Sequence, residues 1–402
     1  MKKIILSFLL FIFISITAFA DDFIETETSE NIFFTEVSNN PSKTPITQSK
    51  NIIVLDRKTL LPLYEKDAYS KVAMASTTKI LTCIIALENN SLNEIITISK
   101  KASSVSGSTL GINTNMKITM NDLLYGLMLR SGNDCAVAIA EHISGTTENF
   151  SILMNQKAKE LGLKNSNFVT PHGLDDPNHY TTAYELALLT DYALKNPKFS
   201  EIVSTKTYTI YPNNSPRIIS NTNELLGYTH GVYGVKTGFT FEAGRCLVSS
   251  CKRNNLDIIV VVLGADTKHI RTKDSLNLIN YTFNTYDYIN IKNTLDSAFN
   301  EFLTIFENNY ILEKTSDKPN LELDTLDNYD FPLSDTASLK LNTKIYTIEK
   351  FNYDLPPGSS VGKLHLYCDD TLLCSVDILL KNELQKNDWK YYFKKSFSYY
   401  KF

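Results

Sequence analysis

Three short motifs carry side chains that could perform nucleophilic chemistry. They are Ser76-Thr77-Thr78-Lys79, Ser131-Gly132-Asn133 and Lys236-Thr237-Gly238, and they occur in this order along the chain. A serine hydroxyl is a poor nucleophile until a base takes its proton. A lysine three residues after a serine lies on the same side of a helix and can be that base. The first motif therefore predicts Ser76 as a nucleophile and Lys79 as its general base.

Each motif is weak when taken alone, and its context decides whether it matters. The Ser-x-x-Lys pattern also occurs at 249–252, 360–363 and 398–401, and Ser-x-Asn also occurs at 29–31 and at four other places. Ser76 differs because it directly precedes an amphipathic apolar stretch, which predicts a helix. Taken singly, the first motif could also be a capped helix, the second a turn and cap, and the third a hairpin turn. Their ordered spacing, 55 residues from Ser76 to Ser131 and 105 residues from Ser131 to Lys236, favours one common site.

The elements that must position these motifs follow from the hydrophobic pattern. A β-branched, almost wholly apolar run at 256–264 predicts a buried strand. Between about 206 and 250, short strand-like runs alternate with turns. The mixture indicates a sheet with helices packed against it. Helices are predicted at 77–88, 121–129, 134–143 and 184–194, and a strand pair at 51–56 and 61–65.

The chain changes character after about residue 288, where the helix signals fade. Alternating segments at 344–351, 363–368 and 372–380 predict strands, and Pro356-Pro357-Gly358 makes a hard break between them. A length of 402 residues allows two or three domains. We therefore predict one domain at 48–288 that holds all three motifs, followed by a small β-rich domain at 289–380.

The N-terminus has the pattern of a secretory signal peptide. Two lysines precede an apolar run at 4–20, which ends in Ala18-Phe19-Ala20, a small-x-small cleavage pattern. An uncleaved N-terminal anchor is the alternative. Residues 21–47 are rich in Thr, Ser, Asn and Glu and are predicted to be a flexible spacer. Under either interpretation, the rest of the chain works outside the cytoplasm.

The last 22 residues, 381–402, predict an amphipathic basic-aromatic helix. They contain six lysines and two acidic residues. Trp389, Phe393, Phe397 and Tyr400 are spaced so that they share one helical face. Aromatic rings beside lysines suit the headgroup region of an anionic membrane. A terminal helix docked on its own domain is the alternative interpretation.

Composition and charge exclude several other classes of protein. Hydrophobic residues make up 43% and charged residues 21% of the chain, as in ordinary globular proteins. A net charge of −4 gives no basic field that would favour nucleic acid as a partner. The six cysteines have no metal-binding spacing. Cys368 and Cys374 flank a predicted hairpin turn, so a disulfide between them is possible in an exported protein.

The motifs and their flanking segments resemble the penicillin-binding serine D-alanyl-D-alanine carboxypeptidases. The resemblance runs through "NIIVLDRKTLLPLYEKDAYSKVAMASTTKILTCIIALE", "LLYGLMLRSGNDCAVAIAEHISG", "NFVTPHGLDDPNHYTTAYELA" and "GVYGVKTGFTFEAGRCLVSSCKR", and it covers most of residues 51–285. Met74 departs from it, since the family usually has proline there. The resemblance implies an α+β, β-lactamase/transpeptidase-like catalytic domain: an antiparallel sheet with helices on both faces plus a helical cluster. The β-rich domain and the basic aromatic tail are similar to the family's C-terminal domain and membrane anchor.

The resemblance also implies how the motif residues meet in one cleft. Lys236 would lie across the cleft from Lys79, where its charge, together with burial, favours the neutral amine of Lys79. The oxyanion hole would consist of the backbone N–H groups of Ser76 and Phe239. Ser131 would relay a proton to the leaving amine, and Asn133 would bind the substrate's amide. Lys236 and Thr237 would bind the substrate's carboxylate, and Gly238 would let the strand approach the substrate closely. Arg245 would either assist carboxylate binding or form a structural salt bridge.

We therefore expect an exported enzyme at the outer face of the cytoplasmic membrane or in the cell wall. It would remove the terminal D-alanine from peptidoglycan stem peptides through an acyl-enzyme on Ser76, without a cofactor or metal. β-Lactams would acylate the same serine. Three alternatives stay open: a β-lactamase, a non-catalytic wall-binding scaffold, and endopeptidase action on cross-links. The residues near Glu185 do not reproduce the E-x-x-L-N context of a class A β-lactamase.

A Ser-His-Asp triad is a further interpretation of the sequence. His172 and His179 lie in a loop rich in Pro, Gly and Asp. However, the one G-x-S-x-G pattern of the sequence, at 358–362, lies in the predicted β-rich domain, far along the chain from both histidines. The resemblance implies that this loop is structural.

Overall fold

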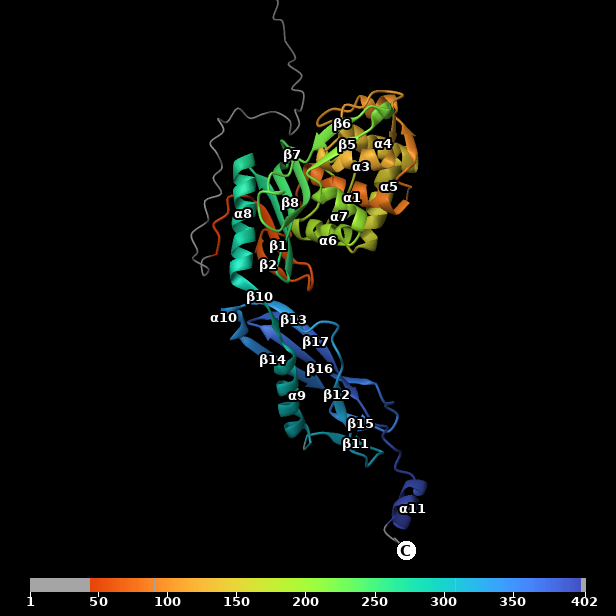
Figure 1. Cartoon of the computed structure of the whole chain (residues 1–402). Helices are drawn as coiled ribbons and strands as arrows, with labels where there is room; N and C mark the ends of the chain where they lie inside the picture. Colours follow the sequence, from red (N-terminus) through yellow and green to blue (C-terminus); the bar gives the residue numbers. More distant parts are fainter. Residues whose placement is uncertain (1–43, 90, 308, 399–402) are drawn as a thin grey trace, which may run out of the picture. The chain divides into compact units, whose positions relative to one another are not determined.

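The computed structural model describes residues 44–89, 91–307 and 309–398 (Figure 1). The predicted signal peptide at 1–20 and most of the predicted spacer at 21–47 therefore lie outside the described residues. The chain divides into two compact units, Met1–Tyr281 and Thr282–Phe402. The division falls a few residues before the predicted boundary at 288.

A five-stranded antiparallel sheet forms the framework of the first unit (Figure 1). Its strands lie in the order β2-β1-β9-β8-β7, so β7, which carries Lys236-Thr237-Gly238, is an edge strand. The central strand β9 is buried along most of its length, as its β-branched sequence predicts. The strands are β1 (Asn51–Asp56), β2 (Pro62–Lys66), β7 (Val232–Thr240), β8 (Gly244–Arg253) and β9 (Leu256–Ala265).

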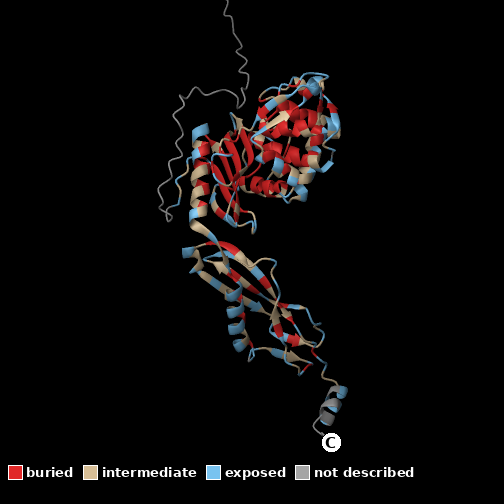
Figure 2. Ribbon diagram, viewed as in Figure 1, coloured by how far each residue is buried: buried red, intermediate tan, exposed pale blue. Residues whose placement is uncertain are grey.

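Helices cover both faces of this sheet. One long helix, α8 (Lys268–Thr285), lies along one face, and a helical cluster lies on the other side (Figure 1). Buried residues fill both the sheet and the interior of the cluster (Figure 2). Within the cluster, α1 buries eight of its eleven residues. The cluster contains α1 (Lys79–Asn89), α3 (Met120–Leu129), α4 (Asn133–Ser144), α5 (Thr147–Glu160), α6 (Ala183–Leu194) and α7 (Pro197–Ser204).

Short elements complete the first unit. The hairpin-like pairs are β3 (Ile95–Thr97) with β4 (Lys117–Thr119), and β5 (Thr207–Ile210) with β6 (Arg217–Ser220). The short helices are η1 (Ala75–Thr78), α2 (Lys100–Ser103) and η2 (Pro212–Asn214). All four predicted helices are confirmed. The sequence analysis missed α5, α7 and α8. In α5 the buried residues Phe150, Met154 and Ala158 recur only every fourth position, which leaves a mostly polar sequence.

The second unit contains a four-stranded antiparallel sheet in the order β12-β17-β16-β14. The predicted strands at 363–368 and 372–380 are confirmed by β16 and β17. The prediction that helices end near residue 288 is wrong, because α9 (Lys292–Phe306) buries Leu295, Phe299 and Phe306 along one side. The bounds are β10 (Tyr286–Asn290), β11 (Ile311–Glu313), β12 (Leu321–Leu323), β13 (Asp330–Ser334), α10 (Asp335–Ser338), β14 (Leu341–Thr347), β15 (Lys350–Asn352), β16 (Ser360–Cys368) and β17 (Thr371–Leu380).

Cys368 and Cys374 are free in the structure. In the β16–β17 hairpin, Cys368 faces Thr371 and Cys374 faces Leu366, so the two cysteines are not opposite each other. The disulfide considered from the sequence therefore does not form in this structure.

The predicted C-terminal helix is present as α11 (Trp389–Ser398). Its Trp389, Tyr392 and Phe393 are exposed. Tyr400 lies outside the described residues. Among the helices of the described ranges, none is both long and apolar enough to cross a membrane.

Candidate active site

Ser76 lies in η1, the tight turn that leads into α1. Two threonine hydroxyls hold this turn: Thr77 donates to the Met74 carbonyl at 2.6 Å and Thr78 to the Ala75 carbonyl at 2.8 Å. Ala75 has a left-handed backbone, with φ of +48°. For a residue other than glycine this conformation costs about 1–2 kcal/mol. The surrounding contacts thus hold a strained backbone immediately before the candidate nucleophile, as is common at functional sites.

Lys79 is fully buried and its amine touches three oxygen atoms. Nζ lies 2.7 Å from Ser76 Oγ, 2.7 Å from Asn133 Oδ1 and 2.8 Å from the His172 carbonyl oxygen. The amide and carbonyl oxygens can only accept hydrogen bonds, whereas the serine hydroxyl can also donate. A neutral amine can therefore donate to Asn133 and His172 while its lone pair faces Ser76. The geometry suits proton transfer from Ser76 to Lys79.

The start of α4 supplies the opposite wall. Asn133 is held from both sides, because its Nδ2 donates to the Ser106 carbonyl and its backbone N–H donates to the Ser108 carbonyl, each at 2.7 Å. Ser131 precedes it, is 2% exposed and has φ of +59°. The Ser131 hydroxyl makes no hydrogen bond to another described residue. It can therefore rotate toward a bound substrate.

Asp134 supports the site, a role that the sequence analysis did not assign to it. Its carboxylate accepts backbone N–H bonds from Leu110, Gly111, Ile112 and Cys135 at 2.8–3.2 Å. The three charge-assisted bonds from Leu110, Gly111 and Ile112 fix the loop that in turn fixes Asn133. An acidic residue after Ser-x-Asn was the only sequence signal, and it does not reveal this distant loop.

The third motif reaches the nucleophile through a close backbone approach. A Cβ on Gly238 would lie 3.1 Å from Ala75 Cβ and from Ser76 N, and 3.2 Å from Thr77 N. Only glycine leaves room for β7 at this distance. Lys236 is buried, lies two residues earlier and therefore shares the face of the strand with Gly238. The structure thus brings the first and third motifs together.

The neighbours of Lys236 on β7 are also held in place. Thr237 Oγ1 lies 2.8 Å from Thr222 Oγ1, and Lys236 Nζ donates to the Thr237 carbonyl at 2.8 Å. Arg245 faces Phe239 across the β7–β8 pair, with its guanidinium carbon 3.9 Å from the centre of the Phe239 ring. This cation–π contact positions Phe239. Carboxylate binding by Arg245 stays a prediction.

The loop with the two histidines contacts the Ser76 turn and supports it. His179 lies 2.8 Å from Thr78 Oγ1 through Nε2, and its Nδ1 accepts from Val169 N at 2.9 Å. Because Nδ1 accepts and Thr78 already donates to Ala75, the ring is neutral with its proton on Nε2. His172 contributes its carbonyl oxygen to Lys79. Both histidines therefore act on the site through other groups and make no bond to Ser76.

Burial gives His179 a pH-dependent role in stability. It lowers the pKa of His179 from 6.5 to about 4, although the Asp176 charge raises it in part. The unfolded chain therefore binds the proton more readily, and stability present above pH 6.5 is lost as pH falls toward 4. We expect this histidine to account for about 3 kcal/mol of that loss. Urea unfolding of His179→Gln should show a shallower decline than wild type, whereas exposed His269→Gln should decline like wild type.

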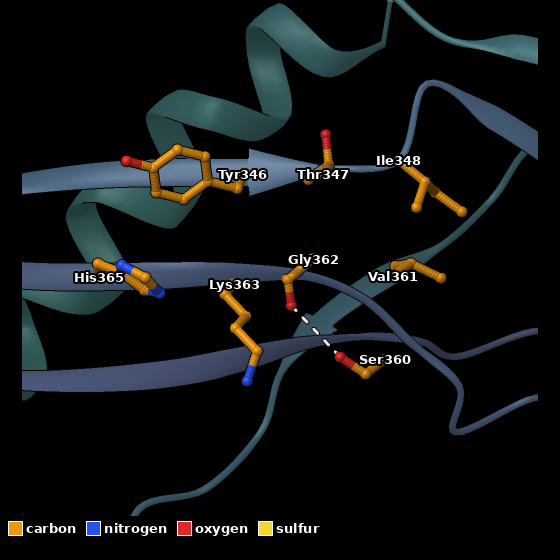
Figure 3. A pocket seen from close by; sticks show the side chains of 8 residues that line it. All are labelled: Tyr346, Thr347, Ile348, Ser360, Val361, Gly362, Lys363 and His365. Atoms are coloured by element: carbon orange, nitrogen blue, oxygen red, sulfur yellow. Dashed lines mark hydrogen bonds between the residues drawn. The ribbon is translucent and has the colours of Figure 1, made fainter.

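The two other Ser-x-x-Lys patterns in the described residues lack this geometry. In the 360–363 pattern, which lines a hollow in the second unit (Figure 3), the Ser360 hydroxyl donates to Asp377 Oδ1 at 2.8 Å, and Lys363 lies 3.2 Å from the same oxygen. Lys363 is thus a half-exposed, ion-paired cation and not a base for Ser360. In the 249–252 pattern, Ser249 is buried and Lys252 is exposed on strand β8. Residue 401 lies outside the described ranges, as does the 29–31 pattern.

Comparison with known proteins agrees with this geometry. A model of the D-alanyl-D-alanine carboxypeptidase family, peptidase S11, matches residues 38–267, which is more than half of the chain. The chain belongs to this family. The predicted family, the α+β fold class and the predicted serine-peptidase class of enzyme are thereby confirmed.

Individual members of the S11 family cover the chain to different extents. DacF of Bacillus subtilis is 35% identical over 246 residues, which span 60% of this chain but only 63% of DacF. DacA of Haemophilus influenzae is 30% identical over 325 residues, or 77% of this chain and 78% of DacA. Penicillin binding protein 5 of H. influenzae has 25% identity and a TM-score of 0.69, and covers 86% of this chain and 99% of its own. A serine-to-alanine mutant of the Streptomyces K15 DD-transpeptidase has 32% identity and a TM-score of 0.58, and the match covers 60% of this chain and 99% of the transpeptidase.

Proposed function

We propose that this chain removes the terminal D-alanine from peptidoglycan stem peptides, with Ser76 as the nucleophile. The proposal rests on the buried Lys79 amine, whose Nζ lies 2.7 Å from Ser76 Oγ. The same Nζ donates hydrogen bonds to Asn133 Oδ1 and to the His172 carbonyl oxygen. A base within hydrogen-bond reach of a serine hydroxyl is the geometric requirement for nucleophilic catalysis. Membership in the D-alanyl-D-alanine carboxypeptidase family supplies the substrate.

In the acylation step, Lys79 accepts the proton of Ser76 as Oγ bonds to the carbonyl carbon of the penultimate D-alanine. The negative charge that develops on the carbonyl oxygen is stabilised by the backbone N–H groups of Ser76 and Phe239. One such donor typically contributes about 3–4 kcal/mol. Lys236 and Thr237 bind the terminal carboxylate. The carbon–nitrogen bond then breaks, and the proton that Lys79 accepted passes through Ser131 to the departing amine, which leaves Lys79 neutral again.

Deacylation returns the enzyme to its starting state. A water molecule attacks the ester carbon, loses a proton to Lys79, and Ser76 Oγ leaves with a proton. Asn133 holds the amide of the bound acyl group throughout, since its side chain is fixed by Ser106 and Lys79. The family relatives include proteins named penicillin-binding, and β-lactams should acylate Ser76 in the same manner.

The described structure does not favour the β-lactamase alternative, which needs a glutamate free to act in deacylation. Glu185, the acidic residue weighed for that role, is buried, and its carboxylate accepts from Asn165 N at 2.8 and 3.0 Å and from Ser166 Oγ at 2.5 Å. These bonds make Glu185 an anchor for the segment before the histidine loop. An acyl-enzyme on Ser76 should consequently persist when the acyl group is a penicillin.

The proposed substrate lies outside the cytoplasm, which agrees with the predicted signal peptide. We place the enzyme at the outer face of the cytoplasmic membrane. The exposed aromatic residues of α11, namely Trp389, Tyr392 and Phe393, and the lysines of the tail support contact with an anionic membrane surface.

The proposed reaction is tested by D-alanine release from a peptide that ends in D-Ala-D-Ala. The wild-type chain should release D-alanine, and Ser76→Ala should release none above background. Ser360→Ala is the matched control, because it removes the serine of another Ser-x-x-Lys pattern and should retain wild-type activity. Equal release by Ser76→Ala and wild type would contradict the proposal.

A further inference from the structure

The connection between β6 and β7 contacts both sides of the active site. The backbone N–H of Thr222 donates to the carbonyl oxygen of Leu129 at 3.1 Å, and Leu129 ends α3 two residues before Ser131. The next side chain, Asn223, is buried and donates through Nδ2 to the carbonyl oxygen of Gly234 on β7 at 2.7 Å. The connection therefore ties the segment that carries Ser131 to the strand that carries the third motif.

A pair of threonine hydroxyls lies inside this junction. Thr222 Oγ1 lies 2.8 Å from Thr237 Oγ1, and Thr237 is 1% exposed. Among the residues that the structure describes, each of the two hydroxyls has the other as its only hydrogen-bond partner. Each hydroxyl carries one proton, so either Thr222 donates to Thr237 or Thr237 donates to Thr222. A ligand that accepts a hydrogen bond from Thr237 decides between these two arrangements.

The proposed reaction requires one of the two arrangements. The terminal carboxylate of the substrate can only accept hydrogen bonds, so Thr237 must donate its proton in order to bind it. Because the Thr237 proton is then engaged, Thr237 Oγ1 can only accept from its neighbour, and Thr222 becomes the donor. A chain of hydrogen bonds then runs from Thr222 through Thr237 to the carboxylate. In a buried site, each bond in such a chain polarises and strengthens the next.

We propose that Thr222 is a positioning residue for recognition of the terminal carboxylate. Its hydroxyl donates to Thr237 Oγ1 and thereby directs the Thr237 proton toward the substrate. The effect is specific for a free carboxylate, because a terminal carboxamide also carries N–H donors and can meet Thr237 in either arrangement of the pair. The proposal rests on the proposed carboxypeptidase function, in which Thr237 binds the carboxylate.

The test compares two peptides that differ only at the C-terminus, one ending in D-Ala-D-Ala with a free carboxylate and the other in its carboxamide. Valine at position 222 keeps the shape of threonine and removes the hydroxyl. Thr222→Val should lower kcat/KM for the carboxylate peptide about three- to tenfold, the usual contribution of one hydrogen bond, and change the carboxamide peptide less than about twofold. The loss should appear in KM with kcat unchanged, since the carboxylate is bound equally in the ground state and the transition state.

Further variants separate an effect through Thr237 from a general disturbance of the connection. Thr222→Ser keeps the hydroxyl and should retain the wild-type preference for the carboxylate peptide. In a Thr237→Val background no hydroxyl is left to be directed, so Thr222→Val should cause no further loss in kcat/KM. Thr209→Val changes another half-buried threonine, on β5, and should behave like wild type. Thermal melting checks that every variant is folded.

Several results would overturn the role of Thr222. They are wild-type kinetics in Thr222→Val, equal losses for both peptides, a loss confined to kcat, or additive losses in the double variant. The last three would indicate that Thr222 acts on the site through the fold of the connection. No release of D-alanine by the wild-type chain would instead contradict the proposed function on which this inference rests.

Discussion

Replacing Lys79 with methionine should lower the rate of acylation by about 10²- to 10⁴-fold. This is the usual contribution of a general base. Methionine keeps much of the volume of the buried lysine stem, so the loss reports mainly the missing amine beside Ser76 Oγ. The measurement is the second-order rate of acylation by a fluorescent penicillin, followed by gel fluorescence.

Lys79→Arg distinguishes a base from a structural cation. Arginine retains a positive charge and hydrogen-bond donors for Asn133 and His172, but it stays protonated in proteins. If Lys79 acts as the base, the arginine variant should be as slow as the methionine variant. Acylation restored by arginine to within tenfold of wild type would show that Lys79 serves only to position its neighbours.

Gly173→Ala should both destabilise the first unit and slow acylation. Gly173 has φ of +86°, and a Cβ there would lie 1.9 Å from the Ala75 carbonyl oxygen and 2.7 Å from Thr78 Oγ1. The clash is with backbone, so the turn that holds Ser76 must move. Left-handed strain and overpacking together predict a loss of about 2–5 kcal/mol in the free energy of unfolding.

Gly162→Ala is the matched control for this prediction. Gly162 also has a positive φ, of +74°, but a Cβ there would meet nothing within 4 Å. The control should therefore lose only the conformational part, about 1–2 kcal/mol, and acylate at the wild-type rate. Urea unfolding and penicillin acylation would be measured on both. A Gly173→Ala protein as stable and as reactive as Gly162→Ala would show that the loop does not support the Ser76 turn.

The pairing of Ser76 with Lys79 could be predicted because it is local. A spacing of three residues on a helix places both side chains on the same side, and the apolar pattern of α1 predicts that helix. The long apolar runs of β1 and β9 likewise identify the central sheet, because a fully buried strand needs an unbroken apolar sequence. Asn133 and Gly238 were assigned to the site through family resemblance, and the structure places both beside the Ser76–Lys79 pair.

Contacts between distant segments could not be predicted in this way. His179 meets Thr78 across 101 residues of sequence, and the carbonyl of His172 reaches Lys79 across 93. Nothing in the local pattern of the loop indicates that His172 serves the site through its carbonyl oxygen, or that the His179 ring supports the Ser76 turn. The helix α9 was missed for a related reason. Its one-sided apolar contacts, such as Leu295 and Phe299, occur in a sequence with many exposed polar residues.

The most direct test of the central claim is the intact mass of the protein after incubation with penicillin, with Ser76→Ala measured alongside. The account predicts a long-lived adduct of one penicillin per chain, mapped by peptide digestion to Ser76 and absent from the mutant. An adduct of equal yield in Ser76→Ala would contradict the assignment of the nucleophile. Rapid turnover of penicillin without a lasting adduct would contradict the carboxypeptidase account in favour of a β-lactamase.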